Sequence, residues 1–230
     1  MVYKSIRQIL DSVLPPRCRC CAVPLEQGQL CDPCSAALPW NASACRQCAL
    51  PMLAEGLCPQ CLRSPPAFDS SWVAFRLQAP VQQAIHALKY HADFGQAHWL
   101  AAQMLQALPP RRDDLPSLLI PVPLHPWRLM RRGYNQAVEI GRHLSTALGL
   151  PMALDTATRR RQTEDQIGQR ASARRRNMRG AFSVGRDLSG LHIALIDDVM
   201  TTGATFNELA AACRRAGARR IEAWAVARTP

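Results

Sequence analysis

Two adjacent carboxylates stand just before a group of hydroxyl side chains near the C-terminal end of the chain. Asp197 and Asp198 are followed, after two residues, by Thr201–Thr205, of sequence TTGAT. Gly203 would let the backbone approach a ligand closely, and the three threonines add hydroxyl donors. Carboxylates accept hydrogen bonds from neighbouring hydroxyl groups or hold Mg²⁺. The combination therefore suits a sugar phosphate.

Cysteines form a second group of residues with chemical potential. Cys18, Cys21, Cys31 and Cys34 follow the pattern C-x2-C-x9-C-x2-C, and the same pattern recurs 27 residues later as Cys45, Cys48, Cys58 and Cys61. Each C-x2-C places two thiolates on one turn, and two such turns supply a closed, tetrahedral, four-sulfur site. We expect about two structural Zn²⁺ ions per chain. Ligation within each repeat and ligation between the repeats are both open.

The distribution of cysteines also bears on the compartment. Nine of the ten cysteines lie between Cys18 and Cys61, and nothing in the sequence directs secretion. The opening sequence, MVYKSIRQILDSVLPP, predicts a short amphipathic helix and not a signal peptide. No apolar run approaches the length of a membrane span. We therefore expect metal binding in a reducing cytoplasm, with no membrane span.

A rigid loop precedes a pair of arginines in the middle of the chain. Residues 121–126, of sequence PVPLHP, follow a buried-strand candidate at 118–122, and their prolines fix the backbone. In α/β folds, loops at the carboxyl ends of strands bind ligands. Arg131 and Arg132 follow, so this region could receive a pyrophosphate group. Residues 89–91, of sequence KYH, are interpreted as a solvated helix end in preference to a ligand-binding role.

Positive charge is concentrated in one stretch. The chain carries 26 Arg and 2 Lys, with a net charge of +11, and residues 111–186 hold 15 Arg against 6 acids. Such a surface favours phosphorylated partners, small molecules or nucleic acid. Residues 158–186 are rich in Arg and Gln and cannot pack as core. They form a disordered basic loop or a lid over an anionic substrate, with Arg170 and Arg174 among the residues expected to face phosphate.

The elements that must position these residues alternate along the chain. Apolar runs predict strands at 71–77, 118–122, 192–196 and 220–227, with helical periodicity between them. Strands that alternate with helices from Phe68 onward predict an α/β fold, a parallel sheet flanked by helices. Cys213 falls on the apolar face of the last helix, where a core role is expected. The prolines at 65–66 suggest a boundary between residues 1–64, the amphipathic helix and cysteine repeats, and residues 67–230.

The segment IDDVMTTGAT resembles the phosphoribosyl-pyrophosphate (PRPP) motif of type I phosphoribosyltransferases. The resemblance implies that Asp197 and Asp198 hold the ribose hydroxyl groups at the catalytic centre. It also implies that the TTGAT loop binds the 5-phosphate, with Mg²⁺ accompanying PRPP. The fold implied is the type I phosphoribosyltransferase fold with a small N-terminal zinc-binding domain.

The whole layout resembles the ComF (GntX-like) family of competence-associated phosphoribosyltransferase-like proteins. The cysteine repeats resemble its double zinc ribbon, IPVPLHPWRLMRRGYNQA its pyrophosphate-loop region, and RQTEDQIGQRASARRRNMRGAF its mobile loop. The residues expected to bind PRPP are Val122, Pro123, Leu124, Arg131, Arg132, Arg170, Arg174, Thr201, Thr202, Gly203, Ala204 and Thr205. The family is linked to natural transformation, which implies single-stranded DNA and a competence helicase as partners. The resemblance to this family does not identify the acceptor substrate.

Two functions follow from this reading. The first is a phosphoribosyltransferase that uses PRPP and Mg²⁺, or a protein that senses PRPP. The second is a single-stranded DNA-binding competence protein that keeps the PRPP fold without catalysis. The mobile loop contains no Lys, whereas some enzymes of the superfamily place a loop lysine on the pyrophosphate. The acceptor and the oligomeric state are open.

Overall fold

The computed structural model describes residues 16–108, 114–160 and 180–229. The chain divides into two compact units, Met1–Pro39 and Trp40–Pro230. Among the described elements, the first unit contains the short helix α2 (Asp32–Ala36), and the others belong to the second unit. The predicted domain boundary between residues 64 and 67 lies within the second unit and stays a prediction. Within the described residues, no helix combines the length and the apolar character needed to cross a membrane.

A four-stranded parallel sheet forms the centre of the second unit. Its order is β1 (Ser70–Arg76), β6 (Arg220–Arg228), β5 (His192–Met200) and β2 (Leu118–Pro121). β6 is buried along nearly its whole length because it has a strand on each side and helices above and below. Its Trp224 packs edge-on against Trp72 of β1, with ring centroids 4.9 Å apart. β1, β2 and β6 coincide closely with the apolar runs that predicted them, and β5 extends beyond its predicted run.

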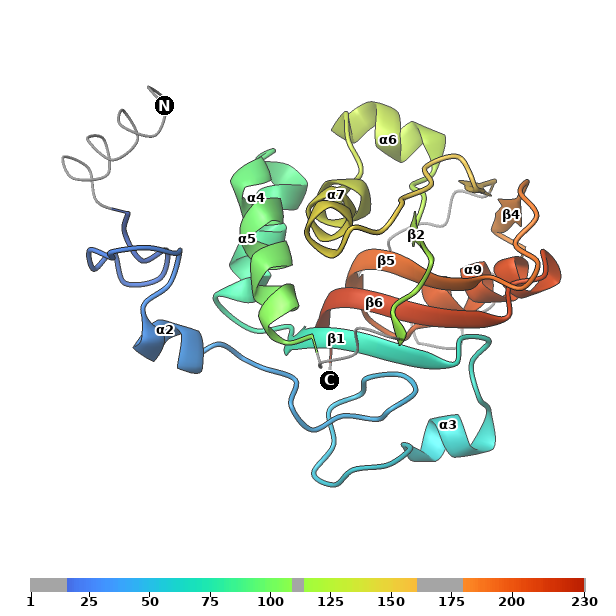
Figure 1. Ribbon diagram of the computed structural model, residues 1–230, viewed down its shortest axis with the longest axis horizontal. Coiled ribbons are helices and arrows are strands. Elements are labelled where there is room, and N and C mark those ends of the chain that lie inside the picture. The colour runs from blue at the N-terminus through green and yellow to red at the C-terminus, as the bar shows by residue number, and fades with distance from the viewer. Residues whose placement is uncertain (1–15, 109–113, 161–179, 230) are drawn as a thin grey trace. The chain divides into compact units, whose positions relative to one another are not determined.

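Helices cover both faces of the sheet (Figure 1). One face carries α4 (Val81–Tyr90), α5 (Phe94–Gln106) and α7 (Gln136–Leu148), and the other carries α9 (Ala204–Arg215). Alternation along β5 separates the two faces, as Ile193 and Leu195 join the cluster under α9 while Ile196 approaches Gly141 of α7. The short helix α6 (Pro126–Arg132) follows β2 and leads into α7.

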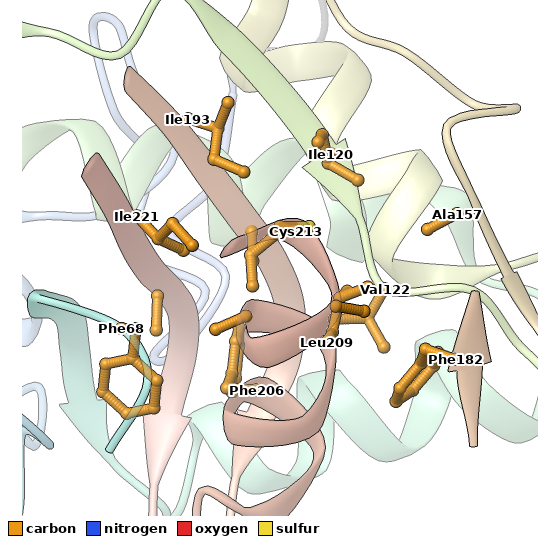
Figure 2. Close-up of a cluster of buried hydrophobic side chains, with 14 of the residues drawn as sticks. Phe68, Ile120, Val122, Ala157, Phe182, Ile193, Phe206, Leu209, Cys213 and Ile221 are labelled. Carbon is orange, nitrogen blue, oxygen red and sulfur yellow. The ribbon is translucent and has the colours of Figure 1, made fainter. Parts of the chain in front are cut away.

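Figure 2 shows the core between α9 and the sheet. Phe206, Leu209 and Cys213 project from one face of α9 toward apolar residues of the strands. Cys213 is fully buried there, so its predicted core role is confirmed. Burial raises the pKa of this thiol to about 12, so it stays protonated.

The structure corrects the prediction for residues 158–186 at both ends of that segment. β3 (Ala157–Arg159) and β4 (Phe182–Val184) form a two-stranded antiparallel sheet. Phe182 is buried in the core cluster, and the guanidinium of Arg159 lies over its ring at 5.7 Å. The basic composition of the whole segment concealed the short strands at its two ends. Residues 161–179 lie outside the described part of the chain.

The second cysteine repeat belongs to the same unit as the sheet. It contains the one-turn helix α3 (Pro59–Arg63), and it is preceded by a segment that pairs with β1. There the backbone N–H of Asn41 donates to the Ala74 carbonyl at 2.9 Å, and the ring of Trp40 packs on Phe75 at 4.6 Å. These contacts attach the repeat to the edge of the sheet at β1.

Candidate functional site

The acidic pair lies on β5, which is longer than the sequence predicted. The ladder with β6 continues to Met200, so Asp197 and Asp198 are strand residues and do not follow the strand. Asp198 is buried, and its Oδ2 atom lies 2.8 Å from Nζ of Lys89 in the last turn of α4. The Oδ1 atom of Asp197 accepts a hydrogen bond from the backbone N–H of Asp198 at 2.8 Å. The two carboxylates therefore have different environments.

These environments shift the pKa values of neighbouring groups. Desolvation acts to lower the pKa of Lys89, but the charge of Asp198 and the hydrogen bond to it outweigh desolvation and raise the pKa. Burial and the charge of Asp198 raise the pKa of Asp197 to about 7, against the lowering effect of Lys89. Lys89 thus stays charged, while Asp197 changes its ionisation near neutral pH.

The hydroxyl-rich loop connects β5 to α9. Gly203 is the N-cap residue of α9 with a φ of +75°, a conformation that residues with a Cβ rarely adopt. The N–H groups in the first turn of a helix have no intrahelical partner and carry the positive end of the helix dipole. The loop thus places the first N–H groups of the helix directly after the acidic pair. Ligand roles for Thr201, Thr202, Gly203, Ala204 and Thr205 stay predictions.

The loop after β2 is held against α7. The backbone N–H of Val122 donates to the Ile196 carbonyl at 2.8 Å, and the Val122 side chain is buried in the core. Asn135 donates from Nδ2 to the Val122 carbonyl at 2.9 Å, while its Oδ1 caps α7 by accepting from the Ala137 N–H at 3.0 Å. Pro123 and Leu124 are partly exposed. The backbone N–H, the carbonyl and the side chain of Val122 are therefore all engaged within the fold, and its contact with pyrophosphate stays a prediction.

A basic cavity of about 390 Å³ adjoins Lys89. The residues that line it are Lys89, Tyr90, His91, Ala92, Arg131, Arg132 and Tyr134. None of these is acidic, and the guanidinium of Arg132 lies over the Tyr90 ring at 5.5 Å. Tyr134 donates its hydroxyl to the Leu88 carbonyl, which ties the region after α6 to α4. The cavity brings the predicted arginine pair together with a lysine that contacts the acidic pair.

Lys89 is the functional candidate that sequence reasoning missed. The sequence predicted a solvated helix end here, and the ion pair with Asp198 shows that this prediction was wrong for Lys89. A signal was present, because the chain uses 26 Arg and only 2 Lys. A lysine kept at a helix end in so arginine-rich a chain indicates a need for a compact point charge. Arg170 and Arg174, in contrast, lie outside the described residues.

The cysteines form two clusters, each made from one repeat. The first cluster is Cys18, Cys21, Cys31 and Cys34, and the second cluster is Cys45, Cys48, Cys58 and Cys61. Within each cluster all sulfur atoms lie within 4.8 Å of one another. Tetrahedral zinc with Zn–S bonds of about 2.3 Å would place sulfurs about 3.8 Å apart. The separations of 3.7 Å for Cys21–Cys31 and 3.6 Å for Cys48–Cys58 fit that value.

One thiol in each cluster has a lowered pKa, whereas hydrogen bonds with neighbouring thiols raise the pKa of Cys34 and burial raises that of Cys61. Burial acts to raise the pKa of Cys45, but backbone N–H groups, including those of Cys48 and Cys58, lower it to about 7. Backbone N–H groups lower the pKa of Cys18 to about 6 in the same way, again against burial. Thiolates are the form that binds metal. The two clusters therefore fit two structural zinc sites, with ligation within each repeat.

Purified protein should contain about two zinc ions per chain, because each cluster offers four converging sulfurs and no open position. Elemental analysis together with thiol titration measures this directly. Cys31→Ser should remove the metal of the first cluster and leave one zinc per chain. Protein with no zinc and free thiols, or with disulfides throughout, would contradict the assignment.

Comparisons with known proteins agree with this geometry. Residues 9–62 match the model of the double zinc ribbon domain, and residues 134–230 match that of the phosphoribosyl transferase domain. The chain is 33% identical to competence protein F of Haemophilus influenzae over 174 residues, which are 73% of this chain and 76% of that protein. It is 34% identical to DNA utilization protein YhgH of Escherichia coli O157:H7 over 223 residues, 94% and 98% of the two chains.

Among solved structures, the chain is similar to a purine phosphoribosyltransferase from Pyrococcus horikoshii Ot3, with a TM-score of 0.33 and 18% identity. That match covers 59% of this chain and 82% of the other. The domain match and the parallel sheet with helices on both faces confirm the predicted fold class. The match to the double zinc ribbon and the two cysteine clusters confirm the predicted N-terminal cysteine-rich region.

Proposed function

Because this chain belongs to the ComF (GntX-like) family of phosphoribosyltransferase-like proteins, we propose that it binds PRPP with Mg²⁺ and transfers or senses the 5-phosphoribosyl group. The observation that carries the proposal is the ion pair between Lys89 and Asp198. It joins the acidic pair, Asp197 and Asp198, to the basic cavity. The acidic pair lies beside the loop Thr201–Thr205, here called the phosphate loop. PRPP carries a phosphate at one end of its sugar and a pyrophosphate at the other. Its binding site therefore needs a phosphate loop, an acidic pair for the sugar hydroxyls and a basic cavity, in that order.

Each part of the ligand has a matching group in the chain. The 5-phosphate would lie on the loop Thr201–Thr205, where N–H groups and the helix dipole favour an anion. The ribose hydroxyls would donate to Asp197 and Asp198. The pyrophosphate would face Lys89 and the two arginines of the basic cavity, which supply positive charge without a competing acid.

The same groups would assist transfer. The C1–O bond to pyrophosphate breaks with its electron pair on the leaving oxygen, and a nucleophile of the acceptor forms the new bond to C1. Positive charge develops on the sugar, and the carboxylates of Asp197 and Asp198 stabilise it from fixed positions. Lys89 stabilises the negative charge of the leaving pyrophosphate. Mg²⁺, when bound, would neutralise further charge on that group.

A binding isotherm tests the proposal. PRPP with Mg²⁺ should bind one molecule per chain, and ribose 5-phosphate should compete because it shares the phosphate and hydroxyl groups. Chelation of Mg²⁺ should weaken PRPP more than ribose 5-phosphate, since only PRPP carries the pyrophosphate. The proposal is refuted if neither PRPP nor ribose 5-phosphate binds at millimolar concentrations.

Binding of single-stranded DNA is a second candidate function. Competence protein F and DNA utilization protein YhgH carry names that refer to DNA handling. Here the supporting observation is the basic stretch at residues 111–186, together with Trp127 on α6. The Trp127 side chain is 46% exposed with Arg131 over its ring at 5.2 Å, an arrangement suited to base stacking. A competence helicase is a further proposed partner.

Single-stranded DNA should bind with strong salt dependence, because arginines that neutralise phosphates release counterions. Replacing Arg174, Arg175 and Arg176 together with Ala should flatten the plot of log affinity against log salt by about two units. Fluorescence anisotropy of a labelled oligonucleotide across a salt series measures this. An unchanged slope and affinity would place any bound DNA elsewhere on the protein.

A further inference from the structure

Arg228, at the end of β6, connects the second cysteine cluster to the phosphate loop. Its side chain is buried, and Nε donates to the carbonyl of Cys48 at 3.1 Å. Nη1 donates to the Met200 carbonyl at 3.2 Å and to the carbonyl of Thr201. It also donates to the Thr229 carbonyl at 2.5 Å. One guanidinium thus holds a metal ligand of the second cluster and the first residues of the loop.

This connection determines how the loop presents its donors. A trans peptide is planar, with its C=O and N–H pointing in opposite directions. Carbonyls of Met200 and Thr201 that point at Arg228 therefore direct the N–H groups of Thr201 and Thr202 to the opposite side of the loop. The Met200 carbonyl also accepts from the backbone N–H of Thr229 at 3.1 Å, so loss of the guanidinium would mainly free the peptide plane between Thr201 and Thr202 to rotate, and the N–H groups would lose their common direction.

A cavity of about 430 Å³ lies between the second cluster and the loop. Cys48 and Cys58 line it from the cluster, Thr202 and Gly203 line it from the loop, and Arg228 lines it as well. The loop therefore has space to relax on this side, so packing alone does not fix its position. The bonds of Arg228 form a direct polar link between Cys48 and the loop.

Charge favours the same arrangement when zinc is bound. A zinc ion with four thiolates carries a net charge of about −2. A guanidinium bonded to the carbonyl of one ligand residue is attracted to that charge, and burial strengthens the attraction. Zinc in the second cluster thus stabilises both the fold of the second cysteine repeat and the position of Arg228.

We propose that the second zinc cluster positions the phosphate loop through Arg228, so that metal in this cluster, and not in the first, sets the affinity for the 5-phosphate. Arg228 is then a positioning residue of the site. The inference rests on the proposed function, because it takes the 5-phosphate of PRPP as the ligand of the loop. It adds that the cysteine-rich region is part of the site and is more than a separate module.

The first test compares Arg228, at the end of β6, with Arg214, in the last turn of α9. Arg228→Gln should keep two zinc ions and reduce the affinity for ribose 5-phosphate about tenfold, a change of one decade. Arg228→Lys should restore part of the affinity, since it keeps the charge. Arg214→Gln is the matched control, because Arg214 also donates to several carbonyls, those of Ala218, Arg219 and Ala67, but lies in the last turn of α9. It should lower the melting temperature and leave the affinity unchanged.

The second test follows the metal itself. Cobalt replaces zinc in four-thiolate sites and gives visible absorption bands that zinc lacks. Ribose 5-phosphate should shift the bands of the cobalt protein, and the shift should persist in Cys31→Ser, which lacks a complete first cluster. Cys58→Ser should abolish the shift and weaken ligand binding, with circular dichroism reporting whether it still folds.

The outcomes separate this inference from the proposed function. If the wild type binds neither PRPP nor ribose 5-phosphate, the proposed function fails and the inference falls with it. If the wild type binds both, yet Arg228→Gln binds equally well, the inference alone is refuted. If Arg228→Gln weakens ligand binding but ribose 5-phosphate leaves the cobalt spectrum of the wild type unchanged, the role of the metal is refuted. If Arg228→Gln does not fold, Arg228→Lys and the wild-type cobalt spectrum decide the question.

Discussion

Replacing both carboxylates, Asp197→Asn with Asp198→Asn, should abolish measurable PRPP binding. Each carboxylate would accept a charge-assisted hydrogen bond from a ribose hydroxyl, worth roughly 1.5–3 kcal/mol. Loss of two would cost about 3–6 kcal/mol, a factor of at least ~10² in affinity. Calorimetry with PRPP and Mg²⁺ on the wild type and the double variant measures the change. Thr202→Val should lose only about tenfold, because the backbone N–H groups remain.

The two single variants should have opposite effects on stability. The pKa of Asp197 is raised to about 7, above its value of 3.8 when unperturbed, so its ionised form is unfavourable in the folded state. Wild-type stability therefore declines as pH rises from about 4 through 7. Asp197→Asn removes this decline, and its advantage should be small at pH 4 and complete above pH 7. Thermal melts across this range measure the difference.

Asp198→Asn should instead destabilise the protein, because it leaves the charge of Lys89 without its carboxylate partner. The side chain of Lys89 is 24% exposed, so water would relieve part of the loss. We expect the free energy of unfolding to fall by about 1–3 kcal/mol, which is below the range for fully buried ion pairs. Equal PRPP affinity in the wild type and the double variant would refute the assignment of this site, whatever the melts report.

Lys89→Gln should weaken PRPP binding by about 10², as a charged donor to pyrophosphate is lost and Asp198 loses its partner. Ribose 5-phosphate should lose less affinity, about tenfold, because it lacks the pyrophosphate that Lys89 would contact. Competition titrations with both compounds separate the two contributions. The difference between them is the specific signature of a pyrophosphate contact.

Arg142→Gln is the control for Lys89→Gln. Arg142 is an exposed cation of α7 that bonds to Glu139 of the same helix at 3.0 Å. Its loss changes the net charge equally and should leave both affinities within twofold of the wild type, because exposed ion pairs contribute little.

If Lys89→Gln weakened the binding of PRPP and of ribose 5-phosphate to the same extent, Lys89 would act only through Asp198, and the pyrophosphate contact would be refuted.

Local patterns in the sequence predicted much of the fold and of the site. The apolar run 192–196 was long enough to indicate a buried parallel strand, and the spacing of the cysteines was sufficient for two four-sulfur clusters. The turn at Thr201–Thr205 between a strand and a helix was predicted because Gly203 and its neighbours are contiguous in sequence, while its binding of phosphate stays a prediction. Features of this kind depend on residues close together in the chain.

Features that depend on distant residues were not predicted. Lys89 meets Asp198 across more than a hundred residues, and only the packing of α4 on the sheet brings them together. Arg228 looks like the end of an ordinary strand until its bonds to Cys48 and the loop are seen. The burial of Phe182 was missed because the longer segment that contains it, residues 158–186, is basic overall. Local composition carries no information about such contacts.

The most direct measurement of the central claim is a crystal structure of the protein with PRPP and Mg²⁺. We expect the 5-phosphate on the loop Thr201–Thr205, the ribose hydroxyls within hydrogen-bond distance of Asp197 and Asp198, and the pyrophosphate facing Lys89. Crystals that contain saturating PRPP but show no ligand at these residues, or that bind it elsewhere, would contradict the account.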